Sequence, residues 1–305
     1  MATAKSFPLV RGRMMRVTKT DGCCGPAYGP DNSVVTEGFV SVALTAAITE
    51  PEEITVVNAN GKTCVRDAGS PTFQGYGVEI TFCEVQPCLF SMITGMPLVT
   101  DATGEVIGFK MNSKIALDSS GFALEVWMGV PGVACEAGAN GAGGAGYLLL
   151  PCLSGGVIGD FTIENAAVTF SVTGAATKDG NAWGTGPYGD MALNTPLDED
   201  DHLYVAFTNV AIPPVTDGCV PLVPSGMTIS IVDETVTLNL PRGAGGCWVN
   251  ESTVDWGDGT APETVPGATS SVTHSYATIG TKTIVVATED CPEVTLQAVI
   301  TAVTP

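Results

Sequence analysis

Apolar and polar residues alternate with a period of two in many short segments of the chain. The clearest segment is residues 76–83, where Tyr, Val, Ile and Phe alternate with Gly, Glu, Thr and Cys. Because successive side chains of a strand point to opposite faces of a sheet, this alternation predicts a half-buried strand. The same pattern recurs at Val40–Leu44, Phe122–Met128, Val168–Val172 and Leu203–Phe207. So many short strands predict a β-sandwich or a β-barrel.

A β-hairpin is predicted between residues 45 and 67. Two short β-branched runs, Ile54–Val57 and Thr63–Arg66, flank the dipeptide Asn60-Gly61. Asn-Gly is the strongest short-range indication of a hairpin, because both residues tolerate the positive φ of a type I′ turn. We therefore expect the two runs to pair across this turn.

One helix is predicted beside the strands, in the segment EVQPCLFSMITG at residues 84–95. Pro87 suits a first helical position, and Gly95 suits a left-handed cap at the end of the helix. The apolar residues between them follow helical spacing and share one face: Leu89, Met92 and Ile93. This face is expected to pack on the sheet.

The chain is predicted to contain two domains. Residues 211–225 hold four prolines, which disfavour both a helix and a central strand, so we place a linker at residues 213–225. Residues 1–212 then form the first domain and residues 226–305 the second. The second domain contains about as many strand-like segments as an immunoglobulin-like sandwich. They are Thr228–Val232, Thr235–Leu240, Thr253–Trp256, Ser271–Tyr276, Thr281–Thr288 and Val294–Val303.

The composition leaves this β-structure short of charge. Charged residues make up 14% of the chain, against roughly 25% in a typical soluble protein, and apolar residues make up 45%. The net charge of −20 repels a phosphate backbone, which argues against sequence-specific nucleic-acid binding. No apolar run reaches the ~18 residues needed to cross a bilayer, and the first 20 residues lack the apolar stretch of a secretory signal. We therefore expect no membrane insertion, and folding in the cytosol.

The basic residues are concentrated at the N-terminus. Five of the twelve precede the first acidic residue, Asp21; they are Lys5, Arg11, Arg13, Arg16 and Lys19. Such a basic arm could fold back on the acidic body or dock on the acidic body of an identical neighbour, because the Coulomb attraction is the same in both cases. A frayed, soluble terminus is the third interpretation.

The titratable residues form no recognisable catalytic motif. Only two histidines are present, His202 and His274, which leaves little general-base capacity near neutral pH. His202 follows the acidic run Asp198–Asp201, and we interpret both as parts of an exposed, solvated turn. No nucleophile motif such as G-x-S-x-G accompanies either histidine. We therefore expect a protein that is not an enzyme.

Two further patterns are interpreted as structural. Residues 141–146 satisfy G-x-G-x-x-G, but the following segment Tyr147–Pro151 is too short for the helix of a dinucleotide site, so Glu136–Gly146 is predicted to be a flexible loop. Ten cysteines in 305 residues fall well short of the roughly 8–10% of a disulfide framework, and they form no C-x-x-C pair. Most of them, including Cys83 and Cys88, are expected to be buried as small apolar residues. We expect no metal and no cofactor.

The C-terminal segment resembles the PKD domain, an immunoglobulin-like β-sandwich. The residues that carry the resemblance are Val254-Asp-Trp-Gly-Asp-Gly-Thr260, then His274-Ser-Tyr276 and Gly280. The resemblance implies that Trp256 is the core aromatic residue, that Asp258 and Gly259 form a turn, and that Tyr276 is an inward anchor beside His274. The sequence departs from the family at Lys282-Thr283, where an aromatic residue commonly follows the glycine.

The first two-thirds of the chain resembles the major tail tube protein of long-tailed, siphovirus-type phages that infect actinobacteria. The resemblance covers residues 8–210 and lies in an ordered series of segments. They are Gly12–Thr18, Gly38–Val42, Val56–Gly61, Cys64–Asp67, Phe73–Ile80, Pro87–Gly95, Gly121–Glu125, Ile158–Asn165 and Asp179–Gly184. The fold that the two resemblances imply is a tail-tube-type β-sandwich or barrel with one flanking α-helix, followed by the immunoglobulin-like sandwich.

This resemblance also implies a function. Proteins of this kind form rings, usually hexameric, that stack into a tube whose joined sheets line a channel for the genome. The implied partners are copies of the same chain and the tape measure, tail terminator and distal tail proteins, while DNA passes through without specific binding. The implied location is the phage virion, with the host cytoplasm during assembly, and the immunoglobulin-like domain would decorate the outside of the tail.

The candidate subunit interface comprises the basic arm, the predicted hairpin and the glycine-rich loop. Its residues are Arg11, Arg13, Arg16, Asn60, Gly61, Gly141 and Gly143. Two other functions stay open. The chain could be an adhesin that binds host cell-wall glycan through the PKD-like domain, where Trp248 and Trp256 are the only tryptophans, or a secreted hydrolase with a PKD accessory module.

Overall fold

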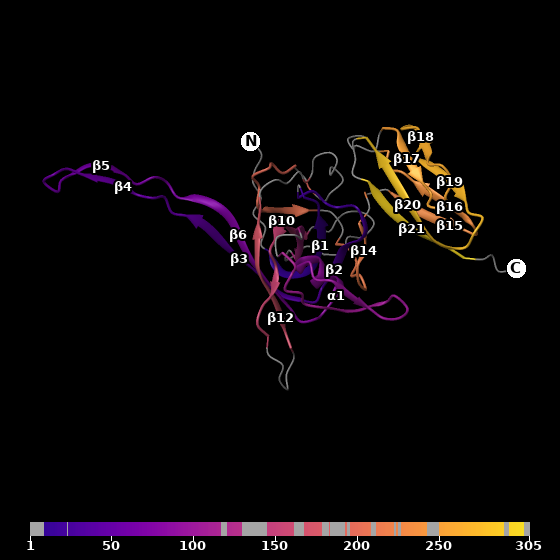
Figure 1. The fold of residues 1–305 in the computed structure, drawn as a ribbon, viewed down its shortest axis with the longest axis horizontal. Coiled ribbons are helices and arrows are strands. Elements are labelled where there is room, and N and C mark those ends of the chain that lie inside the picture. The colour runs from indigo at the N-terminus through magenta and orange to yellow at the C-terminus, as the bar shows by residue number, and fades with distance from the viewer. Residues whose placement is uncertain are drawn as a thin grey trace.

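The computed structural model describes residues 9–22, 24–116, 121–129, 145–161, 168–178, 183, 193, 196–208, 212–222, 224, 227–242, 250–289 and 293–301. These residues are mostly β-structure in several sheets, with one helix among them. Figure 1 shows a body built around the largest sheet, a long two-stranded arm that projects from it, and a sandwich near the C-terminus. The mainly-β fold predicted from the alternation is confirmed.

The body is organised by one antiparallel sheet of ten strands. Its main path runs β14-β2-β1-β9-β10-β12-β6-β3, while β11 pairs with β12 and β13 pairs with β10. The strands are β1 (Val10–Thr20), β2 (Gly29–Thr36), β3 (Phe39–Thr49), β6 (Thr72–Phe82), β9 (Gly121–Gly129), β10 (Ala145–Ser154), β11 (Val157–Ile158), β12 (Phe170–Thr177), β13 (Tyr204–Thr208) and β14 (Val220–Leu222).

The centre of this sheet is covered on both faces. In β9, Leu124 and Val126 join one hydrophobic core, while Ala123 and Trp127 point the other way into a second core. This division follows from the period of two, since neighbouring residues of a strand point to opposite faces. The sequence pattern predicted one buried face here, and the structure buries both.

Helix α1 (Pro87–Thr94) lies against the first of these cores, as predicted. Pro87 begins the helix, and Gly95 ends it with a φ of 70°, the left-handed conformation that glycine adopts without strain. Phe90 is fully buried and stacks on Phe109 with ring centroids 5.4 Å apart. Phe109 belongs to β8 (Val106–Phe109), which pairs with β7 (Leu98–Thr100) in a small hairpin over the helix.

The arm is the continuation of β3 and β6 beyond the body (Figure 1). These strands pair from Phe39 opposite Phe82 out to Thr49 opposite Thr72, and the chain then runs on into the hairpin of β4 (Ile54–Val57) and β5 (Thr63–Asp67). The predicted hairpin is therefore confirmed. Gly61 has a positive φ of 75° but Asn60 does not, so the turn is a three-residue loop closed by the Asn58 N–H to Lys62 carbonyl bond and not the predicted type I′ turn.

One strand departs from its predicted phase. Val40, Val42 and Leu44 were expected on one buried face, but the side chain of Val40 is 59% exposed. The pairing register of β3 shifts between Phe39 and Ser41. Such an irregularity inserts a residue and turns the side chains before it to the other face. Phe39 consequently packs against the core where Val40 was expected.

The N-terminal basic segment is a central strand from Val10 onward, where we expected an arm. Strand β1 lies between β2 and β9, and its residues Met15 and Val17 are fully buried. Arg16 is also drawn inward. Its guanidinium forms a bidentate ion pair with Glu125, whose side chain is completely buried.

The ion pair belongs to a polar network on the side of the sheet that faces the second core, with Glu125 completely buried and Arg16 partly exposed. Tyr147 donates its hydroxyl to Glu125 at 2.6 Å, and the Arg16 guanidinium lies 5.4 Å from the centre of the Trp127 ring. Burial, reinforced by the charge of Glu125, raises the pKa of Tyr147 well above its usual value. Burial also opposes the charge on Arg16, but Glu125 outweighs that effect and raises the pKa of Arg16.

The C-terminal residues form a sandwich of two sheets. One sheet contains β15 (Thr228–Val232), β16 (Thr235–Asn239) and β19 (Ser271–Ser275). The other contains β18 (Glu263–Val265), β17 (Ser252–Asp255), β20 (Gly280–Thr288) and β21 (Val294–Ile300). All six segments predicted from the sequence are strands here, and β18 is an additional one.

The segment predicted to be a linker is fastened to the body. Its strand β14 pairs with β2, with Val220 opposite Ser33. Leu222 and Met227 are buried in one continuous apolar cluster that contains both Trp127 of the body and Trp256 of the sandwich. The body and the sandwich therefore share a hydrophobic connection through this segment.

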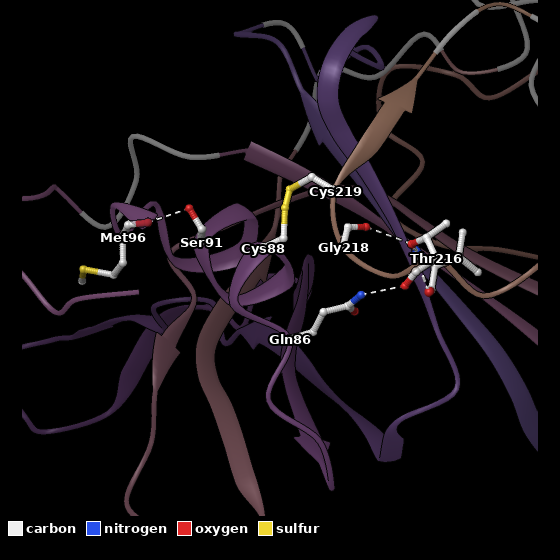
Figure 2. The surroundings of a disulfide bond; sticks show 8 residues. Gln86, Cys88, Ser91, Met96, Thr216, Gly218 and Cys219 are labelled. Carbon is white, nitrogen blue, oxygen red and sulfur yellow. Dashed lines mark hydrogen bonds between the residues drawn. A yellow bond between two sulfur atoms is a disulfide. The ribbon is translucent and has the colours of Figure 1, made fainter. Parts of the chain in front are cut away.

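Two disulfides correct the expectation that the cysteines are only buried apolar residues. Cys24 bonds to Cys152, and Cys88 of α1 bonds to Cys219, just before β14 (Figure 2). Cys83, which was also expected to pack, is exposed. The bonded partners are 128 and 131 residues apart, so no local spacing could indicate the pairing.

Glu125→Gln is expected to destabilise the protein by about 3–5 kcal/mol, because it leaves the Arg16 charge without its partner in the core. The free energy of unfolding in urea measures this loss. The matched control is Glu53→Gln, which breaks the exposed ion pair of Glu53 with Arg66 and should cost less than about 1 kcal/mol. Equal losses in the two variants would contradict a structural role for the buried pair.

Candidate interaction surfaces

The arm carries a row of exposed apolar side chains. Val56 and Val65 lie opposite each other on β4 and β5, and they are 51% and 52% exposed. Further large apolar residues on the arm are similarly exposed: Ile48, Ile54, Val57 and Phe73. A lone two-stranded ribbon cannot bury its faces against itself, so these side chains are available for a partner.

The hairpin tip is locally ordered by its own polar groups. The side-chain oxygen of Asn58 accepts hydrogen bonds from the backbone N–H groups of Asn60 and Lys62, at 3.0 and 2.9 Å. On the flank of the hairpin, Arg66 forms an exposed ion pair with Glu53. Asn60 and Gly61, two of the predicted interface residues, therefore lie at the tip of a shaped projection.

The outer edge of β3 is a second exposed feature. Among the described strands, none pairs with this edge, since β3 is the last strand on its side of the sheet. The strand is eleven residues long and has no charged residue and no proline. Long edges of this kind are usually blocked by charge, proline or a covering element, because an open edge pairs with other chains.

The basic residues predicted for the interface lie in two environments. Arg11 and Arg13 are exposed at the start of β1, while Arg16 is engaged in the buried ion pair with Glu125. Of the three predicted interface arginines, the structure therefore brings Arg11 and Arg13 to the surface, and Lys19 near the end of the same strand is exposed as well. Gly141 and Gly143 lie outside the described residues.

The PKD-like residues gather around one buried tryptophan. Trp256 is 1% exposed, and the imidazole of His274 stacks on it with ring centroids 4.8 Å apart. Tyr276 is buried and donates its hydroxyl to the backbone oxygen of Trp256 at 2.8 Å. The roles expected for Trp256 and Tyr276, core aromatic residue and inward anchor, are thus seen in the structure.

Asp258 ties the turn after Trp256 to the adjoining sheet. Its carboxylate accepts hydrogen bonds from the hydroxyl and N–H of Thr260, at 2.6 and 3.0 Å, and lies 2.8 Å from Nε2 of His274. The Thr260 hydroxyl first, then His274, lower the pKa of Asp258 well below its usual range. Gly259 has a φ of 86°, so the predicted turn at Asp258 and Gly259 is confirmed.

Lys282, one of the two residues at which the sequence departs from the PKD pattern, lies beside Tyr276. The Lys282 ammonium lies 5.6 Å from the centre of the Tyr276 ring. A cation over an aromatic face is attracted by the ring quadrupole. Lys282 is therefore attracted to the Tyr276 ring.

A cavity of about 570 Å³ lies between helix α1, the β7–β8 hairpin and the segment before β14. Its wall includes the Cys88–Cys219 disulfide and carboxylates from Glu84, Glu105 and Asp217. The described residues contain no group of three or more His, Cys, Asp or Glu side chains that could hold a metal ion. The single described helix is too short to cross a membrane.

The histidine at the foot of the arm is packed, which corrects its interpretation as a solvated residue. His202 is only partly exposed, and its ring meets Phe73 edge to face with centroids 5.5 Å apart. The preceding acidic run is exposed and closes a turn in which the Asp201 N–H donates to the Asp198 carbonyl at 3.1 Å. The exposed turn was predicted correctly.

The chain matches no protein-family model and no curated protein sequence.

Asp258→Asn is expected to lower the melting temperature of the sandwich at pH 7 by a few degrees. The folded pKa of Asp258 is lowered, so its contribution is present above the unfolded value of 3.8 and disappears as the pH falls through the folded pKa. The difference between the variant and the wild type should therefore shrink below pH 4. Calorimetric scans from pH 2 to pH 7 test this, with the exposed Glu251→Gln as control. A pH-independent difference would show that the ionised carboxylate is not responsible.

Proposed function

We propose that this chain is a structural protein that assembles with copies of itself into stacked rings, forming the tail tube of a long-tailed phage. One observation carries the proposal: the described residues leave an apolar arm and an uncharged β-edge uncovered on the same subunit. The ring and tube geometry, usually hexameric, comes from the resemblance of the first two-thirds of the sequence to major tail tube proteins.

Burial of the arm's exposed apolar side chains would stabilise an assembly of subunits. Burying a Val or Ile side chain that is about half exposed stabilises a complex by about 1 kcal/mol. The arm presents several such residues on a projection that reaches well beyond the body (Figure 1). A neighbouring subunit that accepted the arm would gain this free energy, whereas the isolated chain cannot.

The edge of β3 supports a sideways contact. A strand from an adjacent subunit would satisfy the free N–H and C=O groups along this edge and extend the sheet between subunits. Strand β13 offers a second suitable element, because its Val205 and Phe207 are 46% and 36% exposed. Contacts between unlike patches close into a ring when the rotation per subunit allows it.

The charge distribution fits a genome channel. With 32 acidic and 12 basic residues, the chain offers few cations to displace the counterions of DNA. DNA would then pass through the tube without specific binding. In this proposal the chain works by assembly, with no catalytic activity, in the virion and, during assembly, in the host cytoplasm. The proposed protein partners besides copies of itself are the tape measure, tail terminator and distal tail proteins.

The PKD-like sandwich would stand on the outside of the tube. The alternative of a glycan-binding adhesin needs exposed aromatic residues on this sandwich. Trp256 is buried beneath His274, and Trp248 lies outside the described residues. The observations on the described residues therefore favour a decorating role over glycan binding.

The concentrated protein is expected to form rings or tubes in negative-stain micrographs, and Val56→Asp with Val65→Lys should abolish them. The two new side chains lie opposite each other on paired strands, so they replace apolar surface with a compatible charge pair and preserve the hairpin. The control is Val232→Asp, at a 69% exposed position of the sandwich, which should assemble normally. Unchanged tubes in the arm variant would contradict the proposed role of the arm.

Ala43→Lys tests the β3 edge separately. Residue 43 lies opposite the exposed Glu79 on β6, so a lysine there gains a cross-strand partner and the monomer should keep its stability. The added charge lies on the outermost strand and opposes pairing with another chain. Sedimentation velocity should then show loss of rings with an unchanged monomer, and the control Ala298→Gly, within the sandwich core, should lower stability without preventing rings.

A further inference from the structure

Among the described residues, the segment that leads into the sandwich is held to the body by the hydrogen bonds of Thr216, the strand β14 and the burial of Leu222. Thr216 exchanges two hydrogen bonds with the backbone of Val35, both at 3.0 Å, and its carbonyl accepts one from the Gln86 side chain at 2.9 Å (Figure 2). Strand β14 then adds a pairing of three residues, with an irregular register and with Pro221, which has no N–H to donate. Such a short edge strand is weak by itself.

The Cys88–Cys219 disulfide connects this weak segment to a rigid element. Cys88 is 3% exposed and lies in the first turn of α1, where its neighbours Leu89 and Phe90 are buried in the core. Cys219 immediately precedes β14. The bond therefore fixes the start of β14 to the well-packed helix. Through Leu222 of β14, it also restrains the apolar contact with the sandwich.

The two disulfides differ in how accessible they are to a reagent. Cys88 and Cys219 both line the cavity of about 570 Å³, and Cys219 is only partly buried. Cys24 and Cys152 are 9% and 1% exposed, with Cys152 inside β10 of the central sheet. Because thiol–disulfide exchange needs a thiolate to reach a sulfur atom, the Cys88–Cys219 bond should react first.

We propose that the Cys88–Cys219 bond is a redox-operated clasp that sets how firmly the sandwich is held on the body. The clasp is open when the two cysteines are thiols, and the segment 213–222 then depends on the hydrogen bonds of Thr216, the short β14 pairing and the burial of Leu222. The clasp is closed when they are oxidised, and the segment is then fixed to α1. This inference goes beyond tube assembly and holds for the isolated chain.

Closing the clasp is a two-electron oxidation by a small-molecule disulfide such as oxidised glutathione. One protein thiolate attacks the reagent, forms a mixed disulfide and releases one small thiol. The second protein thiolate attacks the protein sulfur of that mixed disulfide, forms the Cys88–Cys219 bond and releases the second small thiol. The two thiol protons of the protein end on the two released thiols. In a reducing compartment the reverse exchange keeps the clasp open.

Graded reduction of the full chain tests the proposal. Free thiols are first blocked with N-ethylmaleimide, the protein is treated with increasing dithiothreitol, and newly released thiols are alkylated with iodoacetamide and located by peptide mass spectrometry. We expect the Cys88–Cys219 bond to open at about tenfold lower dithiothreitol than Cys24–Cys152. Opening of both bonds at the same concentration, or of Cys24–Cys152 first, would overturn the proposed selectivity.

Hydrogen exchange at the selective concentration tests the consequence. Amides in residues 213–222 should exchange about tenfold faster once this bond alone is open, while amides in β9 should not change. Cys219→Ser should reproduce the faster exchange without reductant, and Cys24→Ser, which breaks the other disulfide, should not. If residues 213–222 exchange at the same rate with the bond open and closed, the bond is no clasp, whether or not the chain forms tubes.

Discussion

A ribbon of only two strands has no second layer to bury its apolar side chains, and this constraint shapes the molecule. In the centre of the large sheet the apolar side chains are buried on both faces, because β9 and β10 lie between two hydrophobic cores. The arm that continues from β3 and β6 leaves Val56, Val65 and their neighbours exposed. The same chain thus combines a sheet whose centre is covered on both faces with a projection whose apolar side chains can be buried only against another molecule.

The body can support such a projection because its centre is held by more than apolar packing. The Arg16–Glu125–Tyr147 network joins β1, β9 and β10 on one side of the sheet, so these strands resist sliding past one another. A buried ion pair is costly to form, but its geometry is satisfied only in one register. The Cys88–Cys219 disulfide acts farther out, where Cys219 anchors the path toward the sandwich, while Cys24–Cys152 ties β10 of the central sheet to residue 24.

Much of this architecture could be predicted from the sequence, and the failures have physical causes. The hairpin at Asn60-Gly61, helix α1 and the sandwich strands depend on local patterns, and the structure confirms them. The prediction that Val40 faces the core was wrong, because the alternation of apolar and polar residues does not reveal the register shift in β3. Arg16 looked like a surface residue because its partner, Glu125, is 109 residues away in the chain. The two disulfides were missed for the same reason, since the bonded cysteines are far apart in the sequence. The role of the arm in assembly stays a prediction.

In the assembled protein, the arm and the β3 edge should be covered by neighbouring subunits. Amide hydrogen exchange across residues 39–82, compared between dispersed and concentrated protein, measures that covering residue by residue. We predict that protection of β3 and of the arm rises about tenfold on assembly, with little change in the already buried β9. Assembled particles in which β3 and the arm exchange as fast as in the single subunit would contradict the account.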